Sequence, residues 1–236
     1  MLKKILRRSE KGDEMKPLPL DYLLTKTQKA LVLVDVQNEF CHPDGAFGKK
    51  GCDLSPIEGM MEALTALVES ARAKGIPVVF IQNIEDDNTD SFAWRMRPDA
   101  KEDSTNEGVC RRGTWGTLLY GFEPQENDIL VQKNRFSGFL NTPLDSILKN
   151  RGIETLIFTG VATNICVETT ARHASILDYH IILAPDACAT WYPDLHEATC
   201  KNIRLWFGKV ADSDEVISLW AENEPQAQKE IPPECQ

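Results

Sequence analysis

The chain has 236 residues, which suits a single α/β domain built on a six-stranded sheet. With 42% hydrophobic and 26% charged residues, the composition predicts a packed core and excludes a disordered chain. A formal net charge of -10 disfavours nucleic acid and anionic membranes as partners. No apolar run reaches the roughly 18 residues of a membrane span. The N-terminus lacks the apolar segment of a secretory signal, so we expect cytoplasmic residence.

Seven cysteines are scattered through the chain with no C-x-x-C pair. An odd number without paired spacing indicates reduced thiols and not a disulfide framework or a zinc site. We therefore expect at most one or two of them to have a special role.

Five short apolar runs predict the strands of the sheet. They are rich in β-branched residues and lack strict alternation, which is typical of parallel strands buried on both faces. The runs cover residues 30–36, 77–83, 128–133, 154–160 and 179–185.

Helix signals fall between these runs. Ser55-Pro56-Ile57-Glu58 predicts a capping box with Ser55 as the cap, and Gly75 marks the end of that helix. Asn141-Thr142-Pro143 predicts a second start, with Gly152 as its stop. Further helices are expected over about 164–176, 195–207 and 213–220. The alternation predicts an α/β fold, a doubly wound and mainly parallel six-stranded sheet with helices on both faces, over residues 29–222. Residues 1–28 and 223–236 are expected to be terminal extensions.

Polar side chains stand where the predicted strands end. Asp35, Asn83 and Lys133 close the first three runs, and the fourth leads through a turn into Cys166. Because ligands in such folds bind outside the carboxyl ends of the strands, we expect these four side chains to share one crevice. Cys166 is placed near the start of a helix, where the macrodipole favours a reactive thiolate.

Structural roles for the same residues remain open at this point. A free cysteine is commonly a small buried apolar residue, and Asp35 and Lys133 could form an ion pair with no catalytic role. The presence of all three groups at one sheet edge favours catalysis.

Three motifs resemble the isochorismatase-like cysteine hydrolases, a superfamily of three-layer α/β/α enzymes. They are LVDVQNEF around Asp35, LVQKNRFSGF around Lys133 and TGVATNICVETTAR around Cys166. The resemblance implies an Asp-Lys-Cys triad in which Cys166 attacks a carbonyl and Asp35 transfers protons. It also implies an oxyanion hole from the backbone N–H groups of Ala162 and Cys166, a cis Val161–Ala162 peptide, no cofactor, and a homo-oligomer such as a dimer or tetramer.

The resemblance also bears on metals. Nicotinamidases in this superfamily carry an Asp-x-His metal motif after the second strand, whereas this chain has Gln82-Asn83-Ile84-Glu85-Asp86-Asp87 there. A single histidine, His42, stands beside Cys41 and Asp44 and is the alternative ligand. We predict no metal site.

The substrate is expected to be a small ureido or amide compound. Segments around Phe136, Asn141 and Gly160 are most similar to ureidoacrylate amidohydrolases, which implies a ureido substrate. Asn83 could then bind the ureido group, and Phe40, Trp115 and Phe136 could line the pocket; the alternative for each is an ordinary core residue. The segment 85–112 carries Arg95, Arg97, Arg111 and Arg112, which could meet a substrate carboxylate. Biuret, triuret, N-carbamoyl amino acids and carboxamides of the nicotinamide type remain alternative substrates, and a binding protein without activity remains the alternative class.

Overall fold

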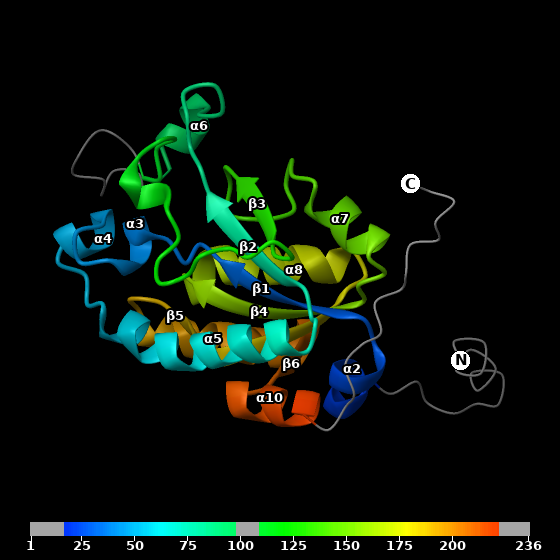
Figure 1. Cartoon of the computed structure of the whole chain (residues 1–236). Helices are drawn as coiled ribbons and strands as arrows, with labels where there is room; N and C mark the ends of the chain where they lie inside the picture. The colour runs from blue at the N-terminus through cyan, green and yellow to red at the C-terminus, as the bar shows by residue number, and fades with distance from the viewer. Residues whose placement is uncertain (1–16, 98–108, 222–236) are drawn as a thin grey trace.

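A parallel six-stranded sheet forms the centre of the molecule (Figure 1). The structure is a computed structural model that describes residues 17–97 and 109–221. The strand order is β3-β2-β1-β4-β5-β6, and every neighbouring pair is parallel. The bounds are β1 Lys29–Val34, β2 Val78–Asn83, β3 Ile129–Lys133, β4 Thr155–Val161, β5 His180–Ala189 and β6 Gly208–Val210. The predicted doubly wound α/β class is confirmed.

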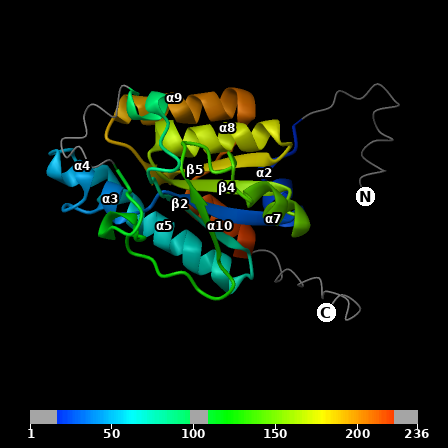
Figure 2. The same cartoon turned by 90° about the horizontal axis from the view of Figure 1, so that it is seen from above.

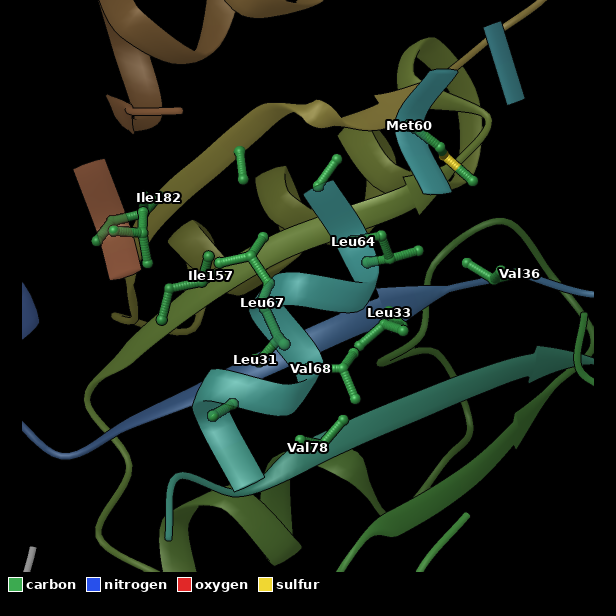
Figure 3. Close-up of a cluster of buried hydrophobic side chains, with 14 of the residues drawn as sticks. Leu31, Leu33, Val36, Met60, Leu64, Leu67, Val68, Val78, Ile157 and Ile182 are labelled. Carbon is green, nitrogen blue, oxygen red and sulfur yellow. The ribbon is translucent and has the colours of Figure 1, made fainter. Parts of the chain in front are cut away.

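One face of the sheet is covered mainly by α5 (Ser55–Ala73), with α2 (Leu20–Lys26) and α10 (Ser213–Ala221) beside it. Figure 3 shows Leu64 and Leu67 of α5 against Leu31 of β1 and Ile157 of β4. Apolar residues three, four and seven apart along α5 form this stripe, because that spacing keeps side chains on one face of a helix. Leu23 and Leu24 of α2 also lie in this core, so the packed domain includes residues before position 29.

The opposite face is covered by α7 (Leu144–Asn150) and α8 (Glu168–Ile176), with α9 (Pro193–Asn202) packed outside α8 (Figure 2). Alternate residues of each central strand face the two cores. Leu31 and Leu33 belong to the α5 side, whereas Val32 belongs to the α7–α8 side. Burial on both faces explains why these strands are continuous apolar runs.

Three local predictions need correction. Ser55 does not cap α5, because it is the first residue of the helix and Leu54 takes the cap position without a side-chain hydrogen bond. The N–H of Ser55 donates to Asp53 Oδ1 at 2.9 Å. Strand β3 lies at the edge of the sheet and is buried on one face only, with Leu130 48% exposed. The sixth strand, β6, has three residues and follows a π-helical turn, η5 (Ile203–Phe207), that replaces the end of the predicted helix 195–207.

The strand order changes direction between β1 and β4, which is the topological switch point of the sheet. Strands β2 and β3 are added on one side of β1, and β4, β5 and β6 on the other. Such a switch point opens a crevice at the carboxyl ends of the strands. Gly160 permits the close approach there, because it has a φ of 103° and a Cβ would stand 2.2 Å from the carbonyl oxygen of Val34.

Short elements close over this end of the sheet. Figure 1 shows α3 (Asn38–Cys41), α4 (Ala46–Lys49) and α6 (Phe92–Arg95) beyond the arrowheads of β1 and β2. The 3₁₀ turn η3 (Trp115–Thr117) joins them through a hydrogen bond from the N–H of Asn38 to the carbonyl oxygen of Leu118. No helix among residues 17–97 and 109–221 is both long and apolar enough to cross a membrane. The predicted tail 223–236 and residues 1–16 lie outside the described chain.

Candidate active site

Asp35 follows the last residue of β1 and turns its carboxylate into the crevice. Its φ of 53° lies in the left-handed region, which side chains other than glycine seldom adopt. The conformation is held from both sides, since the N–H of Asp35 donates to Ile81 O at 2.9 Å and its carbonyl accepts from Gln37 N–H at 2.8 Å. The carboxylate is therefore fixed in place by the ends of β1 and β2.

Lys133 is the last residue of β3 and forms an ion pair with Asp35. Its Nζ lies 2.7 Å from Asp35 Oδ2, and each side chain is 1% exposed. In the strand register Lys133 lies beside Asn83, which in turn is next to the end of β1. Removing either charge would leave the other buried without a partner, so the two groups require each other.

Cys166 completes the group from the other side of the switch point. It belongs to the π-helical turn η4 (Thr163–Val167), which joins β4 to α8, and its Sγ lies 3.5 Å from Lys133 Nζ. The turn is fixed by Thr170 Oγ1, which donates to the carbonyl oxygen of Cys166 at 2.6 Å, and by Thr190 Oγ1, which donates to Asn164 Oδ1 at 2.7 Å. Cys166 remains partly accessible to solvent.

The electrostatics of the three groups favour a protonated thiol beside a strong base. Burial, and then the Asp35 carboxylate, raise the pKa of Cys166, and Lys133 only partly opposes them. Burial also raises the pKa of Asp35 despite Lys133. Burial lowers the pKa of Lys133, but Asp35, Cys166 and Cys110 together outweigh burial, and the pKa of Lys133 is raised. These shifts oppose the predicted thiolate at a helix start and favour ionisation of the thiol by a neighbouring base.

The triad lines a cavity of about 400 Å³. Asn83, Phe40 and Phe136 also line it, as does Ala162. The Val161–Ala162 peptide is cis, as the family resemblance implies. Six of the seven predicted side chains and both predicted backbone donors thus lie around one cavity.

Trp115 is the predicted site residue that the structure places elsewhere. It does not line the cavity, it is 47% exposed, and its ring packs edge-on against His42 at 4.9 Å. The reason lies in η3, where Gln37 Nε2 and Gln82 Nε2 donate to the carbonyl oxygen of Thr117 at 2.9 and 3.0 Å. These bonds hold the turn by its inner side and leave the indole outside.

The arginines of the segment 85–112 divide between two environments. Arg95, Arg97 and Arg111 line the cavity, whereas Arg112 is 57% exposed and pairs with Asp86 at 2.8 Å. Residues 98–108, which belong to the same segment, lie outside the described chain. The segment, including α6, therefore supplies one wall of the cavity.

Three residues with clear roles in the site are absent from the sequence prediction. Gln37 is fully buried and bonds the end of β2, Glu85 is a buried carboxylate in the cavity wall, and Trp94 packs against Phe136 at 4.9 Å. The available signal for Gln37 was a polar residue directly after the apolar run 30–36. Glu85 and Trp94 lie in a loop whose sequence carries no periodic signal.

No cluster of three or more metal-ligating side chains occurs among the described residues. His42 Nδ1 accepts a hydrogen bond from the N–H of Asp44 at 3.0 Å and lies 3.8 Å from its carboxylate. The ring is also packed on Trp115. His42 therefore has a local structural role in the α3–α4 loop.

Comparison with known proteins places this site in a family. The isochorismatase domain model matches residues 29–215. Ureidoacrylate amidohydrolase RutB of Acinetobacter baylyi is 32% identical over 93% of this chain and 95% of its own. Among solved structures, a cysteine hydrolase from Pseudomonas syringae pv. phaseolicola 1448A has a TM-score of 0.74 at 27% identity, covering 89% of this chain and 99% of its own. N-carbamoylsarcosine amidase from Thermoplasma acidophilum has a TM-score of 0.62 at 28% identity, covering 80% and 98%.

The chain belongs to the isochorismatase family. It is a hydrolase of the cysteine-hydrolase type of that family, and its curated relatives are amidohydrolases. The predicted family and enzyme class are confirmed.

Proposed function

We propose that the protein hydrolyses the C–N bond of a small ureido compound through a covalent Cys166 intermediate. The observation that carries the proposal is the contact of three groups in one cavity, with Lys133 Nζ 2.7 Å from Asp35 and 3.5 Å from Cys166. Relatives named for ureidoacrylate and N-carbamoylsarcosine support the ureido group as the target.

The first step is acyl transfer to the thiol. Asp35 takes the proton of Cys166 as Sγ attacks the carbonyl carbon, and the pKa of Asp35, raised by burial, makes it a stronger base than an exposed aspartate. Lys133 stays charged and stabilises the negative charge on the pair. The C–N bond then breaks, and Asp35 returns the proton to the departing amine or ammonia.

The second step releases the carbonyl fragment. Asp35, again a carboxylate, takes a proton from a water molecule, whose oxygen attacks the thioester carbonyl. The C–S bond breaks and the thiol is restored with that proton. When the substituted amine leaves first, the carbamoyl group remains on Cys166 and water releases carbamate. When the ureido NH2 leaves first as ammonia, water releases an N-substituted carbamate.

The backbone N–H groups of Ala162 and Cys166 form the proposed oxyanion hole. Both residues line the cavity at the turn between β4 and α8, where Thr170 holds the carbonyl group of Cys166. Donors fixed in this way stabilise the tetrahedral intermediate, and one such donor is typically worth roughly 100- to 1,000-fold in rate.

Substrate contacts are proposed for Asn83, Phe40 and Phe136. Asn83 lies beside Lys133 in the register and has an amide oxygen that can accept from a ureido N–H. Phe40 and Phe136 supply apolar walls on the α3 and α6 sides of the cavity. No cofactor is required for these steps.

A substrate panel tests the proposal. Purified protein is incubated with ureidoacrylate, biuret, triuret, N-carbamoyl amino acids and nicotinamide, and ammonia release is measured. We expect turnover of at least one ureido compound. Cys166→Ala should reduce that turnover by at least 1,000-fold, whereas the control Cys200→Ala should leave it unchanged. Hydrolysis of nicotinamide alone would change the target bond to a carboxamide, and retained activity in Cys166→Ala would remove the nucleophile assignment.

We also propose a homo-oligomer, a dimer or tetramer, in the cytoplasm. Large exposed apolar side chains such as Trp206 and Ile176 support association, and an odd number of cysteines without paired spacing fits a reducing compartment. Light scattering on the purified protein gives the subunit number, and a monomer at working concentration would contradict the first point.

A further inference from the structure

Glu85 is a charged residue of the cavity wall that the proposed reaction does not use. Its side chain is 5% exposed, and it lines the same cavity as Cys166. The backbone is held on both sides, since Glu85 N–H donates to Cys110 O at 2.9 Å and Glu85 O accepts from Arg112 N–H at 3.0 Å. These two bonds fix the backbone of Glu85, which lies two residues after Asn83 in the chain, in the wall of the cavity.

The polar contacts of this carboxylate are long for a buried charge. Asn83 Nδ2 donates to Glu85 Oε1 at 3.3 Å, and Arg97 Nη2 lies 3.7 Å from the same oxygen, beyond hydrogen-bond range. A carboxylate offers about four acceptor positions. Burial raises the pKa of Glu85 in spite of Arg97 and of the Asn83 and Trp94 side chains beside it. The group retains capacity to accept hydrogen bonds from a bound molecule.

The arginines of the wall are already matched by carboxylates. Arg111 Nη2 lies 2.7 Å from Asp87 Oδ1 and its other nitrogen contacts Asp90, while Arg95 Nη2 lies 3.0 Å from Asp87. Arg97 faces Glu85 and stacks over the ring of Trp94 at 4.0 Å. A substrate carboxylate placed near Glu85 would meet another carboxylate there. Arg97 already faces Glu85, and Arg95 and Arg111 are held by Asp87.

We propose that Glu85 determines substrate specificity, selecting ureido compounds whose far end is an uncharged N–H donor, such as a second amide or ureido group, over compounds with a carboxylate there. This inference rests on the proposed function. Glu85 accepts the N–H groups of that far end while Cys166 attacks the ureido carbonyl. Like-charge repulsion disfavours the carboxylate, so selection works by exclusion as well as by attraction.

Two matched substrate pairs test the inference. Each pair differs only in amide against carboxylate: 3-ureidoacrylamide with 3-ureidoacrylate, and N-carbamoylglycinamide with N-carbamoylglycine. We expect the wild type to prefer the amide by at least about tenfold in kcat/KM, and Glu85→Gln, which keeps the shape and removes the charge, to reduce that preference by about tenfold. The matched control, Glu58→Gln on the exposed side of α5, should leave the preference unchanged.

The results separate this inference from the proposed reaction. A wild-type preference for the carboxylates, or an equal effect of Glu85→Gln on both members of a pair, would overturn the role of Glu85. Failure of the wild type to hydrolyse any ureido compound would instead contradict the proposed function. In that case the binding affinity of each pair for Cys166→Ala is measured by calorimetry, with and without Glu85→Gln. Tighter binding of the amide, reduced by Glu85→Gln, would still support the role of Glu85.

Discussion

The side chain of Gln37 pairs with the backbone of Asn83 as a neighbouring strand would. Its Oε1 accepts from Asn83 N–H at 2.8 Å, and its Nε2 donates to the Asn83 carbonyl at 3.0 Å. The same Nε2 donates to Thr117 O at 2.9 Å. One fully buried amide thus continues the β1–β2 pairing beyond the end of β1 and ties η3 to it.

Replacing Gln37 by alanine should weaken both the fold and the site. Three hydrogen bonds are lost and buried backbone groups are left unpaired, so we expect the free energy of unfolding to fall by roughly 2–4 kcal/mol. Urea denaturation followed by circular dichroism measures the change. The control is Gln125→Ala, an exposed position; a Gln37→Ala variant as stable as this control would show that water replaces the amide.

The Asp35–Lys133 pair should behave as one unit in stability measurements. Asp35→Asn or Lys133→Met alone leaves a buried charge without its partner, and each should cost roughly 3–5 kcal/mol. The double variant has no buried charge left and should recover most of that loss while remaining inactive. Urea unfolding of the four proteins gives the coupling energy. Additive losses in the double variant would mean that the two groups are solvated independently.

Asp35→Asn should have opposite effects on activity and on thiol reactivity. Because the Asp35 carboxylate raises the pKa of Cys166 and Lys133 lowers it, removing the carboxylate should lower that pKa. A fall of about one unit increases the thiolate fraction, and hence alkylation by iodoacetamide near neutral pH, by about tenfold. The rate is followed by mass spectrometry on the peptide containing Cys166, with Cys52, which lines the same cavity, as internal reference. Slower alkylation of Cys166 in this variant would refute the assignment of Asp35 as the group that raises its pKa.

Lys29 should make stability depend on pH. Burial lowers its pKa from 10.5 to about 8, so the unfolded chain binds this proton more tightly than the folded one. The free energy of unfolding should therefore rise with pH between about 8 and 10.5. Lys29→Met removes the penalty, and its stability relative to the wild type should be greatest below pH 8. The exposed Lys26→Met variant is the control, and a constant difference between Lys29→Met and wild type across this range would contradict the expectation.

The central strands and the proximity of Asp35, Lys133 and Cys166 follow from the sequence for a physical reason. Strands β1, β2 and β4 are buried on both faces, so their continuous apolar runs identify them, and parallel strands bring their carboxyl ends to one edge. That geometry is enough to bring Asp35, Lys133 and Cys166 together. The predicted cap of α5 was wrong because the cap position is Leu54, one residue earlier, and the N–H of Glu58 donates to the carbonyl oxygen of Leu54.

Other features depend on contacts that no local pattern encodes. The outward position of Trp115 is set by two glutamines from other segments that bind Thr117 O. Glu85 enters the cavity because its backbone pairs with Cys110 and Arg112 across the loop. Strand β6 has three residues, too few for a hydrophobic period to show. Each of these features is fixed only when distant parts of the chain meet.

The edge position of β3 has a consequence for the lifetime of the active state. Lys133 stands on the outermost strand, whereas Asp35 and the turn that carries Cys166 belong to the central pair β1 and β4. An edge strand has a neighbour on one side only and opens locally at a lower cost than the centre of a sheet. Mild denaturant should therefore open β3 and separate Lys133 from Asp35 while the central strands are still folded. Loss of activity should then precede loss of the fold.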